Sequence, residues 1–226
     1  SVFLIFPTIL ILLMGFLFDN LYHTTIISSY DFYGVTMIFF IAMMGATVPA
    51  NAFLEKHIKN GNTRIFYSPV SRVSIYSSKI LTCFLFMALA LTINIIIFDT
   101  ISLVNFGSDK IGYVILLIIN FVLFLTILSS AICVTLHSEE LTNVILSNSM
   151  SVLGFLSGIF FPIASLGAIF EKIASFSPIK WTVDCIFQLI YDGQSTNYWW
   201  IMFALLTLSS LLLLVVHKNY RPEDYI

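Results

Sequence analysis

Residues 113–136 read YVILLIINFVLFLTILSSAICVTL, a run that contains no charged side chain. A helix that crosses a bilayer needs about 20 apolar residues, within a range of about 17–25. Inside the hydrocarbon region the protein must bond every backbone N–H and C=O group, which leaves helices and closed β-barrels as the possible structures. The run lacks the alternation of apolar and polar residues that a barrel strand shows, so we predict a transmembrane helix.

The composition of the whole chain also indicates a lipid environment. Of its 226 residues 59% are hydrophobic and 10% are charged, and the mean hydropathy is +0.99. Soluble domains are about 45–50% apolar and about 25% charged, and a soluble fold of this length could not bury so much apolar surface. The chain has no basic stripe with interleaved aromatic residues, so nucleic acid is not an expected partner.

Six apolar blocks have the length of a transmembrane helix. They are residues 2–18, 32–54, 80–98, 113–136, 144–161 and 198–217. We therefore predict an all-α integral membrane protein with six transmembrane helices, which form a single domain over residues 1–226. The chain starts at Ser1, inside apolar sequence, so we expect that an N-terminal interfacial segment is missing from it.

The distribution of lysine and arginine predicts how the spans are oriented. Residues 55–79 and the C-terminal tail are basic, whereas residues 19–31 contain neither lysine nor arginine. Because cytoplasmic loops carry the excess of positive charge, we expect the loop 55–79 and both termini to be cytoplasmic. Alternation of the spans puts residues 137–143, HSEELTN, on the same side, where we expect a solvated loop.

No pattern in the sequence predicts catalysis, metal binding or nucleotide binding by this chain. His137 and the two glutamates after it lack the second histidine that a zinc-binding helix requires. The segment from Gly107 to Gly112 has the glycine spacing of a phosphate-binding loop but not its lysine and hydroxyl. The three cysteines stand far apart in apolar runs, which favours small buried thiols over a disulfide or a metal site.

The fifth span carries small residues on one predicted helical face, namely Ser147, Ser151, Gly154 and Gly158. Side chains three and four residues apart lie above one another on a helix, and a pair of glycines four apart lets another helix approach closely. Two interpretations remain open. The face serves either packing within the subunit, or contact with another subunit and a polar route for substrate.

Residues 160–181, FFPIASLGAIFEKIASFSPIKW, are too polar to cross the bilayer and too apolar for an ordinary loop. Pro162 ends the fifth span, because proline cannot continue the ladder of helical hydrogen bonds. Apolar residues then recur at helical spacing. We predict a short helical, re-entrant or interfacial segment over residues 162–181 at the outer side, anchored by Trp181. An amphipathic loop that lies on the membrane is the alternative.

The loop EKHIKNGNTRIFYSPVSRVSIYSSK, residues 55–79, combines basic charge with an apolar and aromatic patch at Ile65, Phe66 and Tyr67. A loop that only connects two spans needs charge and flexibility, but no exposed apolar side chains. The patch favours docking onto a soluble partner, with a plain solvated loop as the alternative.

These segments resemble those of ABC-2 type permeases. In that family the second span is followed by an acidic residue, a turn with glycine, an apolar stretch, the pattern sPvsr, and a lysine that opens the third span. The corresponding residues here are Glu55, Gly61, Ile65-Phe66-Tyr67, Ser68-Pro69-Val70-Ser71-Arg72 and Lys79. The family pattern G-x-F-F-P … P-x-x-W/Y-x-x-D is similar to Gly158 to Pro162 followed by Pro178, Trp181 and Asp184, and Phe6-Pro7 fits the first span.

The resemblance implies the membrane subunit of a bacterial ABC exporter in the plasma membrane. Such a subunit forms a homodimer or heterodimer and pairs with separate ATPase subunits, which hold ATP and Mg²⁺, so no cofactor is expected in this chain. The implied substrate is amphipathic, such as a drug, an antimicrobial peptide or a lipid-linked compound, and antibiotic resistance is a compatible role. The implied ATPase-coupling residues are Glu55, Gly61, Arg64, Ile65, Phe66, Tyr67, Pro69 and Arg72. The implied external gate contains Pro162, Glu171, Lys172, Pro178 and Trp181.

Two other functions remain compatible with the sequence, a non-transporting immunity or assembly scaffold and a secondary carrier. A carrier coupled to protons or sodium usually needs ionisable groups near the middle of the bilayer, or broken helices in repeated halves. The predicted spans offer only Asp99 near one end and the amides of Asn94, Asn120 and Asn148 inside. This disfavours the carrier and leaves the exporter as the leading interpretation.

Overall fold

The computed structural model describes residues 2–19, 27–54, 70–160, 167, 172, 174–175, 177–193 and 197–221. Within these residues the regular structure is helical and contains no strand, which confirms the all-α prediction for this part of the chain. The elements are α1 (Val2–Leu17), α3 (Ser29–Met44), η1 (Gly45–Thr47), α4 (Val48–Leu54), α6 (Arg72–Thr100), η3 (Ser108–Lys110), α7 (Ile111–Leu136), α8 (Glu139–Leu156), α10 (Pro178–Phe187), the π-helical η5 (Gln188–Asp192) and α11 (Tyr198–Asn219).

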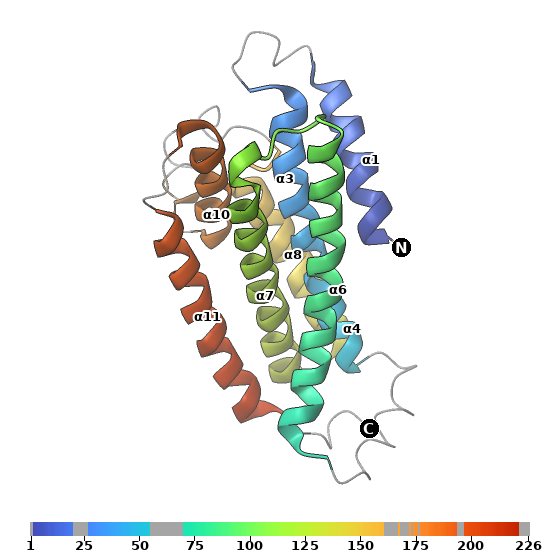
Figure 1. The fold of residues 1–226 in the computed structure, drawn as a ribbon. Helices are drawn as coiled ribbons and strands as arrows, with labels where there is room; N and C mark the ends of the chain where they lie inside the picture. The colour runs from blue at the N-terminus through green and yellow to red at the C-terminus, as the bar shows by residue number, and fades with distance from the viewer. Residues whose placement is uncertain are drawn as a thin grey trace.

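The long helices run alternately up and down along one axis (Figure 1). One end of the bundle, named the lower end after its place in Figure 1, contains the end of α4, the start of α6 and the end of α11. The opposite, upper end contains α10, η5 and the start of α11. The lower end carries Arg72, Lys79 and Lys218, and it corresponds to the side that the basic loops predict to be cytoplasmic.

Four helical stretches of the described chain are long and apolar enough to cross a membrane, Ser29–Leu54, Arg72–Thr100, Ser108–Leu136 and Tyr198–Asn219. They correspond to the second, third, fourth and sixth predicted spans. The helix α1 is apolar but shorter. The helix α8 carries several serines and asparagines and is not among the four. Both coincide in position with the first and fifth predicted spans, which therefore remain predictions.

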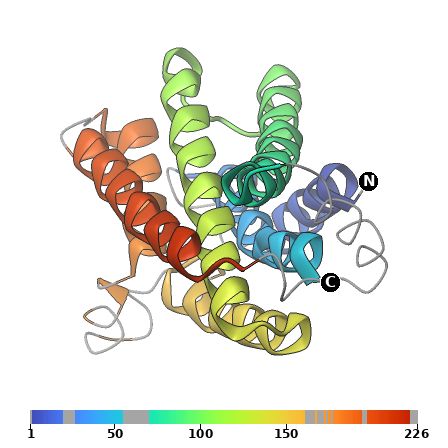
Figure 2. The same ribbon diagram turned by 90° about the horizontal axis from the view of Figure 1, so that it is seen from below.

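The helix α7 forms the centre of the bundle. It packs against α11, α6, α4 and α8, and the view from below shows it between α11 and α6 (Figure 2). Its Phe121 side chain is fully buried and meets Phe39 of α3, with ring centroids 5.1 Å apart. The buried Asn120 donates from Nδ2 to the carbonyl oxygen of Met202 on α11 at 3.1 Å. The Tyr198 hydroxyl on α11 also donates to the carbonyl oxygen of Tyr113 on α7 at 3.0 Å. Apolar packing thus holds α7, and hydrogen bonds at two levels join it to α11.

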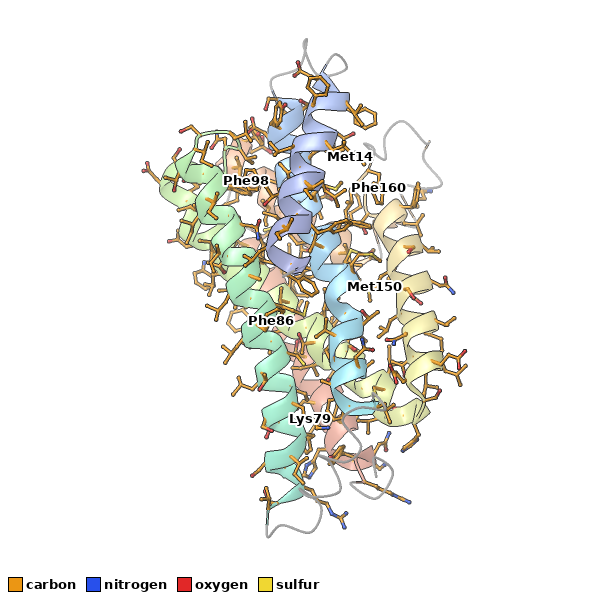
Figure 3. All side chains as sticks on the ribbon, turned by 90° about the vertical axis from the view of Figure 1, so that its right-hand side faces the viewer. Met14, Lys79, Phe86, Phe98, Met150 and Phe160 are labelled. Atoms are coloured by element: carbon orange, nitrogen blue, oxygen red, sulfur yellow. The ribbon has the colours of Figure 1, made fainter. Side chains whose placement is uncertain are left out.

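The outward faces of α6 and α11 are covered with large apolar side chains. Leu89 and Ile97 are exposed on α6, and Phe203 and Leu214 are exposed on α11. Phe86 on α6 is also half exposed (Figure 3). Soluble monomers rarely expose contiguous apolar patches larger than a few hundred Å². A surface of this kind is suited to contact with lipid tails.

The helix α6 begins at Arg72, ahead of the predicted span at residue 80. Ser71 is its N-cap, and the Ser71 side chain accepts a hydrogen bond from the backbone N–H of Ser74 at 3.2 Å. A serine that satisfies one of the free N–H groups of the first turn is a strong helix start signal. The polar residues up to Lys79 therefore extend the helix beyond the apolar block.

The prediction of a solvated loop over residues 137–143 is wrong. His137 ends α7 in the left-handed conformation, with φ of 54°. Ser138 then caps α8 by accepting a hydrogen bond from the N–H of Leu141 at 3.3 Å. Glu139 and Glu140 occupy the first turn of α8, where the helix dipole favours negative charge. The polar residues of this segment therefore cap and begin the helix α8.

Candidate functional site

At the lower end, four aromatic residues join three helices, and we call them the lower aromatic cluster: Phe53, Tyr76, His217 and Tyr220. The Tyr76 hydroxyl lies 3.0 Å from Nδ1 of His217. The ring centroids of Tyr76 and Tyr220 are 5.4 Å apart, and those of Phe53 and Tyr220 are 6.0 Å apart. Burial raises the pKa of Tyr220 to about 12. The cluster connects the end of α4, the first turns of α6 and the end of α11.

Lys79 joins α6 to the end of α4 beside this cluster (Figure 3). Its ammonium group donates to the backbone carbonyl oxygen of Ala52 at 3.0 Å and lies 5.2 Å from the centre of the Phe53 ring. The last carbonyl groups of a helix lack partners within the helix and carry partial negative charge, so a cation stabilises them. The aromatic ring adds a cation–π attraction. Spacing along the sequence does not predict this contact.

Most residues that we expected to couple to an ATPase lie outside the described residues. They are Glu55, Gly61, Arg64, Ile65, Phe66, Tyr67 and Pro69. Arg72 is described, as the exposed first residue of α6. The structure therefore defines the two helices that flank the predicted coupling loop, and Lys79 links them directly.

The predicted small-residue face of α8 is divided between the surface and the interior. Ser151 is exposed, Ser147 is partly buried, and Gly154 is buried. A Cβ atom at Gly154 would lie 3.7 Å from Cε of Met43, so this glycine faces α3 of the same subunit. The Ser147 and Ser151 hydroxyls donate to carbonyl oxygens one turn earlier in α8. Gly158 follows the helix, with φ of 79°.

The predicted outer segment, residues 162–181, ends in the first turn of α10, a helix that packs against α11, α3, α7 and α8. Pro178 is its first residue, a position where proline is favoured. The exposed Trp181 donates from Nε1 to the carbonyl oxygen of Ser175 at 2.6 Å. Lys180 and Asp184, one turn apart, form an ion pair at 2.9 Å.

The remaining gate residues are placed only in part. Lys172 is exposed, and Pro162 and Glu171 lie outside the described residues. The structure therefore locates the end of the segment next to α10 and leaves its re-entrant character a prediction.

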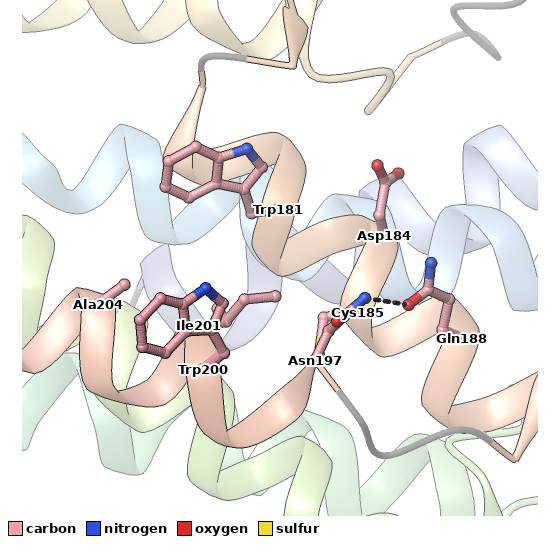
Figure 4. A pocket seen from close by; sticks show the side chains of 8 residues that line it. All are labelled: Trp181, Asp184, Cys185, Gln188, Asn197, Trp200, Ile201 and Ala204. Atoms are coloured by element: carbon pink, nitrogen blue, oxygen red, sulfur yellow. Dashed lines mark hydrogen bonds between the residues drawn. The ribbon is translucent and has the colours of Figure 1, made fainter.

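A cavity of about 310 Å³ lies between α10, η5 and the start of α11 (Figure 4). Asn197 donates from Nδ2 to Oε1 of Gln188 at 3.5 Å across it. Burial and the nearby charge of Asp184 raise the pKa of the lining Cys185 thiol to about 11. Sequence reasoning missed this site, because residues of α10 and α11 meet only through the tertiary fold.

The part of the chain that the structure describes contains no group of three or more histidine, cysteine, aspartate and glutamate residues placed to hold a metal ion. Cys83, Cys133 and Cys185 are buried free thiols.

Comparison with known proteins identifies one family. A sequence model described as ABC-2 family transporter protein matches residues 23–216. This range includes Phe53 and Tyr76 of the lower aromatic cluster, but not His217 and Tyr220. It also includes all residues that line the cavity between α10 and α11. No curated protein and no solved structure matches the chain significantly.

Proposed function

The chain belongs to the ABC-2 transporter family, and from this premise we propose that it is the membrane-spanning permease subunit of an ATP-driven exporter. The match over residues 23–216 is the observation that carries the proposal. A permease of this family is a transport component and is not itself catalytic, so a separate ATPase subunit would bind ATP and Mg²⁺ and hydrolyse the nucleotide.

The loop 55–79 would dock onto that ATPase at the cytoplasmic side. ATP can shift a transporter between inward and outward states only through its different affinity for the two states, so a movement of the ATPase must reach the helices. The end of α4 and the start of α6 flank the loop and are joined by Lys79, and the lower aromatic cluster joins both to α11. A displacement of the loop would therefore move three helices together.

Two such subunits would form the translocation pathway. The side of α8 that is exposed carries Asn148 and Ser151 among apolar residues. Polar side chains are costly in contact with lipid tails and are common at helix interfaces in membranes. This supports a location of α8 at the contact between two permease subunits, along the route of an amphipathic substrate.

The complete subunit would have six transmembrane helices, with α1 and α8 as the first and fifth, in a bacterial plasma membrane. Both termini would be cytoplasmic, since the loop 55–79 and the C-terminal end of the chain carry basic residues. The segment 162–181 would lie at the outer side and gate the pathway. The position of α10 at the upper end supports this placement (Figure 1).

Reconstitution with an ATPase subunit tests the proposal. The chain would be co-expressed with the ATPase of its own operon, purified, and placed in proteoliposomes that contain a fluorescent amphiphile. We expect the ATPase to co-purify and ATP to drive movement of the amphiphile without a proton or sodium gradient. Transport that follows an ion gradient without ATP would replace the exporter by a carrier. Failure of any ATPase to bind would favour a non-transporting scaffold.

A pair of variants tests the coupling loop in the same assay. Arg64→Glu combined with Ile65→Ser should uncouple ATP hydrolysis from transport, because both the charge and the apolar contact are lost. Lys218→Glu, in the last turn of α11 and outside the loop, is the matched charge reversal and should leave the coupling unchanged.

A further inference from the structure

The cavity between α10 and α11 combines aromatic faces with a single carboxylate. Figure 4 shows the indoles of Trp181 and Trp200 at one side of the cavity and the polar ends of Asp184, Gln188 and Asn197 at the other. The two indoles come from different helices, α10 and α11. Aromatic faces opposite a carboxylate are the arrangement that binds organic cations in proteins.

Asp184 is the charged residue that lines the cavity, and both of its carboxylate oxygens contact the ammonium group of Lys180, at 2.9 and 3.0 Å. Its side chain is 46% exposed, whereas the side chain of its partner Lys180 is 19% exposed and does not line the cavity. Among the described residues that line the cavity, none is basic. A concave site lined by one sign of charge attracts the opposite sign, so the cavity favours a cation, which would share the Asp184 carboxylate with Lys180.

The indoles add both attraction and order. A cation within about 6 Å of an aromatic ring is attracted to its face, and tryptophan gives the strongest effect. The Trp181 indole is held by the hydrogen bond from its Nε1 to the carbonyl oxygen of Ser175 at 2.6 Å. A ligand that packs on this indole therefore loses little free energy in ordering the side chain. Trp200 is 77% exposed, so a bound ligand would cover part of its indole ring.

The size of the cavity and its surroundings indicate the rest of the ligand. A volume of about 310 Å³ is at the lower end of the range of about 300–1,000 Å³ for ligand sites, which suits a headgroup better than a whole molecule. Below the cavity, α11 continues with the exposed apolar side chains of Phe203 and Leu206. An alkyl chain could follow this lipid-facing surface while its head stays in the cavity.

We propose that this cavity binds the ammonium head of an amphiphile, with the ammonium group against Asp184 and its methyl or methylene groups against the indoles of Trp181 and Trp200. The ammonium group can belong to a membrane lipid such as phosphatidylethanolamine or to a free cationic amphiphile. The site is complete within one subunit, so binding needs neither the ATPase nor transport.

Tryptophan fluorescence measures this binding directly, because the chain has only three tryptophans. Trp199 does not line the cavity, and Trp199→Phe leaves the two indoles of the site as the reporters. This variant would be purified in a maltoside detergent and titrated with a brominated alkyl-trimethylammonium compound, which quenches indoles on contact. The control ligand is a brominated alkyl maltoside of equal chain length. We expect saturable quenching by the cation at concentrations where the neutral ligand quenches little.

Two substitutions with opposite expected effects separate recognition from structural damage. Asp184→Asn should weaken cation binding about tenfold, since it removes the charge and keeps the shape. Lys180→Gln should tighten it about two- to fivefold, since it frees Asp184 from a competing cation. Loss of binding in both variants, or equal affinity in Asp184→Asn and its parent, would overturn the proposal, as would equal quenching by the neutral ligand.

A competition arm identifies the source of the ammonium group. The same titration is repeated in nanodiscs of phosphatidylglycerol, with and without phosphatidylethanolamine. If the ethanolamine lipid displaces the probe, and Asp184→Asn abolishes this displacement, then the cavity is a lipid headgroup site. If the probe binds equally in both nanodiscs and still requires Asp184, then the ligand is a free cationic amphiphile.

Discussion

The phenolic oxygen of Tyr76 on α6 lies 3.0 Å from Nδ1 of His217 on α11, although 141 residues separate the two in sequence. Tyr76 is 5% exposed, and His217 is exposed at the helix surface. The bond therefore joins α6 to α11 at the lower end, and Tyr76 lies within the residues 55–79 that we propose to dock onto an ATPase. The net contribution of such a bond to stability becomes smaller as water replaces it more easily.

Tyr76→Phe should lower the free energy of unfolding by about 0.5–1.5 kcal/mol, because it removes the hydroxyl and keeps the ring that packs on Tyr220. Thermal unfolding in detergent measures the change. Tyr113→Phe is the matched control, since Tyr113 is exposed, and its effect should stay within about 0.5 kcal/mol. If the double variant with His217→Ala is as destabilised as the sum of the single variants, then the bond does not contribute.

Asn94 provides a second interhelical link, between α6 and α1. Its Nδ2 donates to the carbonyl oxygens of Phe3 at 3.2 Å and Ala90 at 2.8 Å. The Thr8 hydroxyl lies 3.2 Å from Asn94 Oδ1. Hydrogen bonds between membrane helices contribute about 0.6 kcal/mol each on average, and Asn94 makes two of its bonds to α1.

Asn94→Leu should therefore lower the free energy of unfolding by about 1–2 kcal/mol and loosen α1 from the bundle. Limited proteolysis of α1 and thermal unfolding would report the two effects. Asn148→Leu makes the same change at an exposed position on α8 and should not loosen α1. Equal protection of α1 in the parent and in Asn94→Leu would show that apolar packing alone holds it.

Local patterns in the sequence predict the long helices well. The predicted spans 113–136 and 198–217 differ by only two residues at one end from α7 (Ile111–Leu136) and α11 (Tyr198–Asn219), because unbroken apolar runs leave few alternatives in a bilayer. The errors occur where polar residues belong to a helix. Ser71 and Ser138 are caps, and serine followed by residues suited to a first turn is a signal that could have been used.

Contacts between distant segments could not be predicted in this way. Tyr76 meets His217, and Trp181 and Trp200 line one cavity. No periodic pattern in the sequence between the members of each pair predicts that they meet. Gly154 shows the same limit. Its spacing to Gly158 predicts a close approach of helices, but only the fold shows that the nearest neighbour is Met43 of the same subunit.

The Cys185 thiol should react slowly with iodoacetamide at neutral pH. Burial and the charge of Asp184 raise its pKa from 9.0 to about 11, and only the thiolate is nucleophilic. The labelling rate should therefore rise about tenfold per pH unit up to about pH 11. Peptide-resolved mass spectrometry separates Cys185 from Cys83 and Cys133. A rate that levels off near pH 9 would mean that the thiol has its ordinary pKa.

The same shift predicts how stability depends on pH. The folded chain holds the proton of Cys185 more tightly than the unfolded chain, so the unfolded chain ionises first as pH rises. The contribution of Cys185 is fully present below pH 9 and is lost between about pH 9 and pH 11. Replacement by alanine should flatten this part of the unfolding profile.

Two glycines in the membrane domain should respond in opposite ways to alanine. A Cβ atom at Gly34 would lie 2.4 Å from Cγ1 of Val104, and Val104 is buried and stiff at χ1. Gly34→Ala should therefore lower the free energy of unfolding by about 1–3 kcal/mol, as overpacking does. Val104→Ala should restore part of the loss, because it removes the two methyl groups that clash.

Gly154→Ala should be neutral or slightly stabilising, since the added methyl group would meet Met43 and Phe160 at 3.7 and 3.8 Å and alanine favours a helix by about 1 kcal/mol. The measurement is thermal unfolding of each variant in detergent, with the parent chain beside it. Because Gly154 is buried against α3, the substitution should also leave contact between subunits unchanged, whereas Ser151→Leu alters the exposed side of α8. If Gly154→Ala weakened dimerisation while Ser151→Leu did not, the pairing surface would have to include the buried glycine, and α8 would have to separate from α3 when two subunits meet.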